Sequence, residues 1–365
     1  MKIAFYGSSL LSSYWNGAAT YYRGVIRDLA SRGHDVIFYE PEAYDRQAHN
    51  DIEPPSWARS RVYPAMAAAL RGVMAEAALA DVVVKTSGVG VFDDELITGV
   101  MAHARPDAVR IFWDVDAPAT LDEIRPYPEH PLRQALPGLD LVLTYGGGPP
   151  VVAAYEALGA RRCVPIYNAL DPDTHHPVPP ESRFAAHLSL LANRLPDREK
   201  RVEAFFLDAA ARLPERRFLL GGNGWADKPM PSNIRQLGHV PTRDHNALNV
   251  SAMAVLNIAR DSMAVTGYSP ATRVFEACGA GACLITDAWV GLDLFLAEGT
   301  EVLVARDGAD VAAHVAALPP ARARAIGEAA RARMLAGHTY THRGVEADAL
   351  LRQESARKRA VAAHA

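Results

Sequence analysis

The sequence has few cysteines, no long apolar run and no excess of basic residues, and each absence excludes a class of protein. Only three of its 365 residues are cysteines, without a CxxC or Cys/His cluster, so we expect neither a disulfide framework nor a zinc site. No stretch of about 20 apolar residues occurs, which predicts no membrane span. The net charge of −4 lacks the basic excess of many nucleic-acid-binding proteins. We therefore expect a cytoplasmic protein with no nucleic-acid partner.

The first half of the chain alternates short apolar runs with helical stretches. Its N-terminal apolar run breaks at a Gly-Ser-Ser sequence, which is more typical of a first strand than of a signal peptide. Later runs rich in Val, Ile and Phe end in Gly or Asp, as in "DVVVKTSG", "AVRIFWDVD" and "DLVLTYGGG". Such runs, separated by helices, predict a parallel sheet with both faces covered, within residues 1–170.

A segment rich in proline, aspartate and histidine divides the sequence in two. Because proline opposes both helix and central strand, "NALDPDTHHPVPPESRF" predicts an interdomain linker at 171–184. The alternation then restarts at "AHLSLLAN", with a turn region between "RFLLGGNG" and "MAVLNIA", and predicts a second α/β domain at 185–340, before a C-terminal helix at 341–365. We expect two Rossmann-like doubly wound domains facing a central cleft, into which the carboxyl ends of the strands open.

The stretch "GYSPATRVFEACGAGACLITD" places a carboxylate on an otherwise apolar helix. Ser269 is predicted to cap this helix, with Pro270 in its first turn. Free N–H groups at such an N-terminus are a good phosphate site. Thr272 and Glu276 are four residues apart and share a face, which fits a diphosphate at the cap and a ribose hydroxyl at Glu276. An ion pair between Glu276 and Arg273 is an equally good alternative.

A basic cluster follows the strand "AHLSLLAN". Arg194, Arg198, Lys200 and Arg201 lie in the loop "ANRLPDREKRVEAF", where their charge and donors suit a diphosphate. The alternative is a solvated helix start whose cations pair with neighbouring acidic residues.

Two further residues of the second half are candidate ligand contacts. Gly222 in "LLGGNGWAD" lets the backbone approach a ligand closely, or simply forms a tight turn. His239 in "QLGHVP" lies either beside a nucleobase or in an ordinary loop.

In the first half, the Gly/Ser loop after the first strand is expected to offer free N–H groups. The stretch "FWDVDAPATL" contains Asp114 and Asp116, whose side chains lie on the same side of an extended run. The pair is a candidate for holding a divalent metal, for a general base, or for capping the next helix. No complete GxGxxG fingerprint or Walker A spacing follows a strand, which disfavours a Rossmann dehydrogenase.

Jointly, these motifs resemble the GT-B fold glycosyltransferases, most closely the CgeB-like branch, which is named for a spore maturation protein. The resemblance rests on "SPATRVFEACGAGACLITD", "NALDPDTHHP", "ANRLPDREKRVEAF", "KTSGVGVFDDEL" and "FWDVDAPATL". It implies Glu276 on the donor ribose, and Ser269 and Thr272 near the phosphates. It also implies Arg194 and Lys200 on the diphosphate, with Arg198 beside them.

The resemblance implies transfer of a hexose from a nucleotide-diphosphate sugar, with UDP as the default leaving group and no cofactor. GT-B enzymes generally need no bound metal, because cations and a helix dipole stabilise the leaving diphosphate. The acceptor, whether small molecule, glycan or protein, is left open. Its candidate contacts are Ser8, Asn16 and Lys85, with Asp114 and Asp116 as candidate catalytic groups.

Other outcomes stay open at this point. Better-studied retaining relatives have two glutamates with seven residues between them, and the earlier position here is Tyr268, so the stereochemical outcome is undecided. A sugar-nucleotide epimerase on the same fold, and a non-catalytic protein that binds sugar nucleotides or glycans, are the alternatives.

Overall fold

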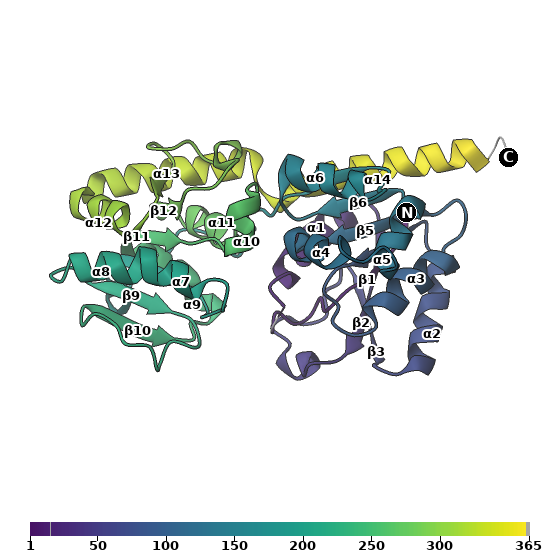
Figure 1. Ribbon diagram of the computed structural model, residues 1–365, viewed down its shortest axis with the longest axis horizontal. Coiled ribbons are helices and arrows are strands. Elements are labelled where there is room, and N and C mark those ends of the chain that lie inside the picture. The colour runs from purple at the N-terminus through teal and green to yellow at the C-terminus, as the bar shows by residue number, and fades with distance from the viewer. Residues whose placement is uncertain (15, 363–365) are drawn as a thin grey trace. The chain divides into compact units, whose positions relative to one another are not determined.

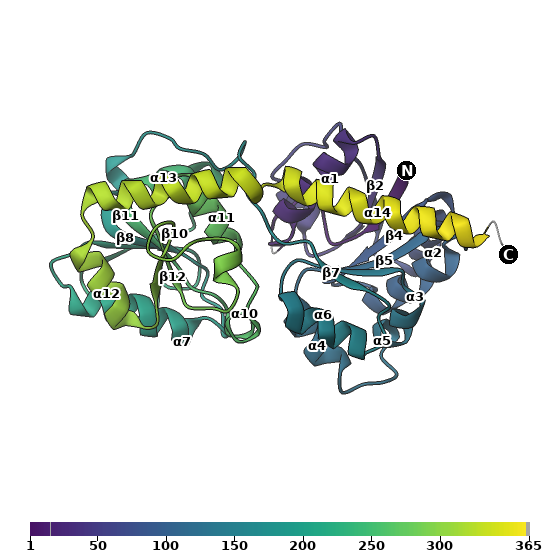
Figure 2. The same cartoon turned by 90° about the horizontal axis from the view of Figure 1, so that it is seen from above.

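The computed structural model of the chain describes residues 1–14 and 16–362. The chain forms two compact units, shown in Figures 1 and 2. Unit 1 comprises residues 1–167 together with the C-terminal segment from Tyr340, and unit 2 comprises residues 168–339.

Unit 1 is built on a seven-stranded parallel sheet with the order β3-β2-β1-β4-β5-β6-β7. Its strands are β1 (Lys2–Tyr6), β2 (Asp35–Glu42), β3 (Arg59–Pro64), β4 (Val82–Thr86), β5 (Val109–Asp114), β6 (Leu141–Thr144) and β7 (Cys163–Pro165). Its helices are α1 (Ala19–Ser31), α2 (Ala67–Ala75), α3 (Asp93–His103), α4 (Ala117–Ile124), α5 (Pro131–Ala135), α6 (Gly148–Ala157) and α14 (Tyr340–Ala362). Every residue of β4 is buried, because helices cover both faces of a central parallel strand.

Unit 2 is built on a six-stranded parallel sheet with the order β10-β9-β8-β11-β12-β13. Its strands are β8 (Ala186–Leu191), β9 (Phe218–Gly221), β10 (Ile234–Gly238), β11 (Ala252–Asn257), β12 (Leu284–Asp287) and β13 (Leu303–Ala305). Its helices are α7 (Glu199–Val202), a π-helical turn (Glu203–Leu207), α8 (Asp208–Arg212), α9 (Thr242–Ser251), α10 (Asp261–Thr266), α11 (Thr272–Gly279), α12 (Gly308–Ala317) and α13 (Pro320–Gly337).

Both sheets follow the doubly wound order, in which the third strand of the unit lies at one edge and the chain reverses beside the first strand. The reversal lies between β1 and β4 in unit 1 and between β8 and β11 in unit 2. Ligands of such sheets bind outside the carboxyl ends of the strands at this switch point. The predicted α/β class and the two parallel sheets are therefore confirmed. A ligand site is expected at the carboxyl ends of the strands beside each switch point, which we call the carboxyl edge of the sheet.

Aromatic packing stabilises the core of each unit. In unit 2, Phe206 and Phe218 are fully buried, with ring centroids 5.6 Å apart in an edge-to-face arrangement. Burial of one such side chain contributes about 2–3 kcal/mol. The helices α11 and α13 pack together over the same sheet, as do α8 and α12.

The C-terminal helix α14 belongs to unit 1, where it lies along α1 (Figure 2). Close approach of the two helices requires a glycine, because a Cβ on Gly24 would lie 2.2 Å from Cγ of Tyr340. Asp140 pairs with Arg357 at 2.6 Å and with Lys358 at 3.1 Å, so the basic end of α14 is tied to β6. No helix in the described part of the chain is both long enough and apolar enough to cross a membrane.

Candidate functional site

The helix of the predicted phosphate site begins later than the sequence suggested. α11 starts at Thr272, with Ala271 at the N-cap position and no side-chain cap. The hydroxyl of Ser269 donates instead to the carbonyl of Gly267, at 2.9 Å. The predicted cap by Ser269, with the following proline in the first turn, is therefore wrong. The cause is local: the chain turns sharply at Gly267, where φ is +71°, and this turn occupies the serine.

Tyr268 holds the loop after β11 against the loop after β12. Its backbone lies in the left-handed region, with φ of +49°, where a bulky residue is strained. Its N–H donates to the carbonyl of Val290 at 2.6 Å. Its ring lies over Gly291, where a Cβ would come within 2.2 Å of it. These contacts offset the strain and order the approach to α11.

Glu276 has three basic neighbours. Its Oε2 lies 2.9 Å from Nη1 of Arg273 and 4.0 Å from Nδ1 of His245, and its Oε1 lies 3.8 Å from Nε2 of His175. Burial alone raises the pKa of Glu276, but Arg273 and the two histidines outweigh it and hold that pKa below its usual value. The carboxylate is therefore ionised, and the ion pair with Arg273 that the sequence offered as an alternative is formed.

The ion pair leaves hydrogen-bonding capacity unused. Among the described residues, neither Oε2 of Glu276 nor Nη1 and Nε of Arg273 has a hydrogen-bond partner, although all three atoms are buried. Oε1 accepts no hydrogen bond either, and it is not among the fully buried atoms. An incoming hydroxyl thus finds an accepting oxygen at Glu276.

The two histidines beside Glu276 were not singled out from the sequence. His175 comes from the segment after the first unit, and His245 comes from α9, which packs against α11. Burial, followed by the nearby Arg273, lowers the pKa of His245 to about 4. His245 is therefore neutral at pH 7, and its Nε2 lies 3.1 Å from the carbonyl of Val240.

Some basic residues of the loop after β8 form ion pairs with described carboxylates, and others do not. Arg194 pairs with Glu199 at 2.7 Å and with Asp227 at 2.9 Å. Lys200 is exposed and forms no ion pair with any described residue. Arg201 pairs with the fully buried Asp287 at 2.6 Å.

Arg198 is the exception in this loop. It is half-buried, its buried Nε has no hydrogen-bond partner, and no described carboxylate forms an ion pair with it. Burial lowers the pKa of Arg198, and the neighbouring cations Arg260 and Arg273 lower it further. Asp197 and Asp287 raise this pKa, but their effect is smaller. Asp197 is already paired with Arg260 at 2.6 Å. Three arginines thus meet at the carboxyl edge of β8 and β11.

Gly222 and His239 follow the neighbouring strands. Gly222 has φ of +117°, and a Cβ there would lie 2.1 Å from the carbonyl oxygen of Ala192, which also accepts from Nε1 of Trp225. Close packing of backbone explains this glycine. His239 is exposed after β10 and has no hydrogen-bond partner among the described residues. A ligand contact by either residue stays a prediction.

In unit 1, the loop after β1 is internally bonded. The N–H of Gly7 donates to Tyr39, and the N–H of Leu10 donates to Oε2 of the buried Glu40 at 2.6 Å. The expectation of free N–H groups is wrong at these two residues, because β2 supplies their acceptors. Ser8 donates its hydroxyl to Oδ1 of Asn16 at 2.9 Å.

The other predicted residues of unit 1 lie at the same edge. Lys85 is buried and pairs with Asp93. Asp114 is fully buried and accepts from Tyr155, from Thr120 and from the backbone of Asp116. Burial raises the pKa of Asp114, and the hydrogen bond from Tyr155 is the strongest of the contacts that oppose this rise.

Asp116 takes the N-cap position of α4 without a side-chain cap. Within the described residues, no three His, Cys, Asp or Glu side chains gather in an arrangement that could hold a metal ion.

Backbone strain marks both carboxyl edges. Among the described residues, positive φ occurs outside glycine at Tyr44, Asp45, Phe92 and Tyr268. Tyr44, Asp45 and Phe92 lie in the loops directly after β2 and β4, and Tyr268 lies between α10 and α11 in the connection from β11 to β12. Strained residues persist where the surrounding structure holds them, and they concentrate at functional sites. The edges around the two switch points are therefore the candidate sites.

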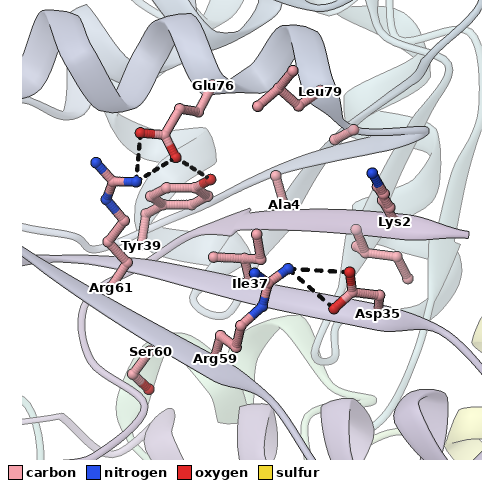
Figure 3. Close-up of a pocket in the computed structure, with 12 residues that line it drawn as sticks. Lys2, Ala4, Asp35, Ile37, Tyr39, Arg59, Ser60, Arg61, Glu76 and Leu79 are labelled. Carbon is pink, nitrogen blue, oxygen red and sulfur yellow. Dashed lines mark hydrogen bonds and ion pairs between the residues drawn. The ribbon is translucent and has the colours of Figure 1, made fainter.

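A pocket of about 480 Å³ lies elsewhere in unit 1, over β1, β2 and β3 (Figure 3). Four of its charged lining residues form ion pairs with one another: Arg59 with Asp35 at 3.1 Å, and Arg61 with Glu76 at 2.6 Å. It includes Lys2, Asp35 and Arg59, the first residues of the three strands. Because doubly wound sheets bind ligands at the opposite, carboxyl ends, this pocket is not a candidate functional site.

Comparison with known proteins places these features in context. Residues 198–352 match the family model described as glycosyl transferase-like. No curated protein sequence matches the chain. Sucrose-phosphate synthase from Thermosynechococcus elongatus is similar in structure, with a TM-score of 0.72 and 15% identity over 98% of this chain and 100% of that one.

Two further solved structures are similar over the same span. HepE from Anabaena, in complex with UDP-glucose, has a TM-score of 0.70 and 13% identity, covering 97% of this chain and 100% of its own. A glycosyltransferase from Rickettsia africae has a TM-score of 0.63 and 12% identity, covering 97% and 98%. The chain therefore has the GT-B fold.

Proposed function

We propose that the chain is a glycosyltransferase that uses a nucleotide-diphosphate sugar, with a UDP-sugar as the default donor, and that the donor binds unit 2. The match of residues 198–352 to the glycosyl transferase-like family supports transfer chemistry. The UDP-glucose complex of HepE, a protein of similar fold, supports the choice of donor.

The observation that carries this proposal is the half-buried Arg198, whose buried Nε has no hydrogen-bond partner and which forms no ion pair with a described carboxylate, beside Arg260 and Arg273. A buried charge without a partner costs several kcal/mol, which the protein must offset elsewhere. A diphosphate supplies the missing anion, and a guanidinium binds phosphate oxygens through two parallel hydrogen bonds. The cluster lies at the switch point, where doubly wound sheets bind nucleotides.

In the proposed reaction, the bond between the anomeric carbon and the diphosphate oxygen breaks, and negative charge builds on the leaving diphosphate. Arg198 and Arg273 are fixed before the reaction and stabilise that charge as it forms. These arginines supply the positive charge, so we propose that the reaction is metal-independent, with Lys200 and Arg194 at the outer side of the diphosphate. Thr272, at the start of α11, is proposed to donate to a phosphate, with Ser269 behind it.

Glu276 is proposed to bind the ribose. Its Oε1 accepts no hydrogen bond from the described residues, and two ribose hydroxyls are suitable donors. Arg273 serves this role by keeping the carboxylate ionised and oriented, so the ion pair supports ribose binding. His239 and Gly222 are proposed to lie along the nucleoside.

Unit 1 is proposed to bind the acceptor through the edge that carries Ser8, Asn16 and Lys85. The oxygens of Asp114 are already occupied by Tyr155, Thr120 and a backbone N–H. The role of accepting the proton of the acceptor hydroxyl is therefore proposed for the partly exposed Asp116, with Asp114 as its positioning residue.

Titration calorimetry with UDP tests the donor site. Arg198→Gln is expected to weaken UDP binding by about tenfold to a hundredfold, since hydrogen bonds to charged groups contribute about 1.5–3 kcal/mol. Arg212→Gln is the matched control, because Arg212 pairs with Asp208 on the exposed side of α8. Unchanged affinity in Arg198→Gln would contradict the proposed site. Release of UDP from UDP-sugars, with and without added acceptors, then separates transfer from binding alone.

A further inference from the structure

Unit 1 contains a second buried arginine that lacks an anionic partner. Arg46 is 6% exposed and begins the short 3₁₀ turn Arg46–His49 after β2. Its Nη1 donates to the carbonyls of Ser8 at 3.3 Å and Val89 at 3.1 Å. Its Nε is buried without a hydrogen-bond partner. In the described part of the chain, no carboxylate forms an ion pair with it, and backbone carbonyls are its only hydrogen-bond acceptors.

The nearest carboxylates are engaged by other groups. Glu40 accepts the N–H of Leu10 at 2.6 Å, and Asp93 pairs with Lys85. Arg23 of the same unit differs from Arg46 in this respect, since it pairs with Asp51 at 2.7 Å. The positive charge of Arg46 is therefore only partly balanced inside the unit.

Arg46 lies at the carboxyl edge of the sheet, directly after two residues with a strained backbone. The two residues before it, Tyr44 and Asp45, both adopt left-handed conformations with φ of +56° and +58°. The hydroxyl of Tyr44 donates to the carbonyl of Gly90 at 2.6 Å, which ties the loop after β2 to the loop after β4. The carbonyls that hold Arg46 come from the loops after β1 and β4, the two strands that flank the switch point.

We infer that this edge of unit 1 carries an oxyanion subsite centred on Arg46, which holds a phosphate or carboxylate group of the acceptor. The guanidinium has donors left for such a group, and its planar fork can bind two oxygens of a phosphate or a carboxylate at once. The ring of Tyr44, which is 57% exposed and centred 5.0 Å from the guanidinium carbon, offers an adjacent surface for the remainder of the ligand. The assignment to the acceptor rests on the proposed function, whereas the binding of an oxyanion does not.

Inorganic phosphate is the probe, with binding followed by titration calorimetry. Because the arginines of unit 2 also attract phosphate, the comparison is made in the Arg198→Gln background. Adding Arg46→Gln is expected to weaken the remaining phosphate binding by about tenfold or more. Arg59→Gln is the control, because Arg59 is exposed and paired with Asp35, and it is expected to leave phosphate binding unchanged.

Arg46→Lys separates binding from folding. Lysine keeps the charge but loses the planar fork, so weaker phosphate binding at an unchanged melting temperature supports the subsite. Equal phosphate affinity with and without Arg46→Gln or Arg46→Lys would overturn it. Titration with glucose 6-phosphate and with glucuronic acid then decides whether the subsite holds a phosphate or a carboxylate. If the Arg46 variants bound both sugars as tightly as the protein with Arg46 intact, that result would also count against the subsite.

A titration with UDP distinguishes the proposed donor site in unit 2 from the oxyanion subsite at Arg46. Arg46→Gln is expected to leave UDP affinity unchanged, because the two arginines belong to different units. Absence of UDP binding in the natural chain would refute the donor site while leaving the phosphate comparison at Arg46 intact. Loss of UDP affinity in Arg46→Gln with no change in phosphate binding would refute the subsite as placed here.

Discussion

Arg273 and Glu276 lie one turn apart on α11 and form an ion pair, with Nη1 2.9 Å from Oε2, that lacks hydrogen-bond geometry. Both residues of the pair belong to one short helix, and His175 and His245 from other segments help Arg273 to keep the carboxylate ionised. No described residue donates a hydrogen bond to Oε1 of Glu276, so this oxygen can accept one from a ligand. The following predictions test this pair and the packing around both sites.

Glu276→Gln is expected to remove a pH-dependent contribution to stability. The pKa of Glu276 in the folded state lies below its usual value of 4.5. Its contribution is therefore complete above about pH 4.5 and is lost as the pH falls through the folded pKa. The melting-temperature difference between the natural chain and Glu276→Gln should be largest near neutral pH and shrink toward about pH 3. A difference that grows on acidification would contradict this assignment.

Glu276→Ala is expected to weaken the binding of UDP by about tenfold while leaving pyrophosphate binding nearly unchanged, because only UDP carries the ribose that the carboxylate accepts. Arg273→Gln should weaken both ligands, since it removes a phosphate partner as well as the neighbour of Glu276. Calorimetry with the two ligands measures this directly. Equal losses for UDP and pyrophosphate in Glu276→Ala would argue for a purely structural carboxylate.

Arg198→Met is expected to raise stability in the absence of ligand by about 1 kcal/mol, because it replaces an unpaired buried charge by an apolar chain of similar length. Urea unfolding of the ligand-free protein measures the change. Arg212→Met, at an exposed position of α8, should stay within about 0.5 kcal/mol. A clear loss of stability in Arg198→Met would show that the arginine has an internal structural role.

Tyr155→Phe is expected to destabilise the protein by about 1–3 kcal/mol, since Asp114 loses a donor in a fully buried environment. Tyr127→Phe is the control, because that ring is 62% exposed. Urea unfolding compares the two variants. If Tyr155→Phe were as stable as the control, Asp114 would not depend on the hydroxyl.

Gly222→Ala is expected to cost more than about 2 kcal/mol, because the new Cβ would lie 2.1 Å from the carbonyl of Ala192 and φ is +117°. Gly17→Ala meets open space at an ordinary φ and should change stability by less than about 0.5 kcal/mol. Thermal unfolding distinguishes the two. A mild effect at Gly222 would mean that the loop after β9 shifts to accept a side chain.

The central strands were predictable because their signal is local. A strand covered on both faces is apolar over most of its length, so β4 and β12 begin with apolar residues and become polar only at their carboxyl ends. The strands β3 and β10 were not predicted, and both lie at sheet edges. An edge strand is half exposed and tolerates charge, as the sequences of β3 and β10 show, so its apolar pattern disappears.

The helix start and the loops were less predictable. The turn at Gly267 moved the start of α11 beyond the serine that was expected to cap it. The helix α9 lies in a stretch that reads as a turn region, because only Ala247, Leu248 and Asn249 of its residues are buried. Such elements are stabilised by packing against neighbours that sequence periodicity does not reveal.

The amino-acid sequence by itself determined two parallel sheets and the residue types gathered at their carboxyl ends. Only the tertiary structure decided which of those groups have internal side-chain partners, as Arg194, Lys85 and Asp114 do. Among the described residues, no carboxylate forms an ion pair with Arg198 or Arg46, and Arg46 donates only to backbone carbonyls. The physical reason is that apolar periodicity acts over a few neighbouring residues, while the partner of a charge depends on which distant loops the strand order brings to one edge.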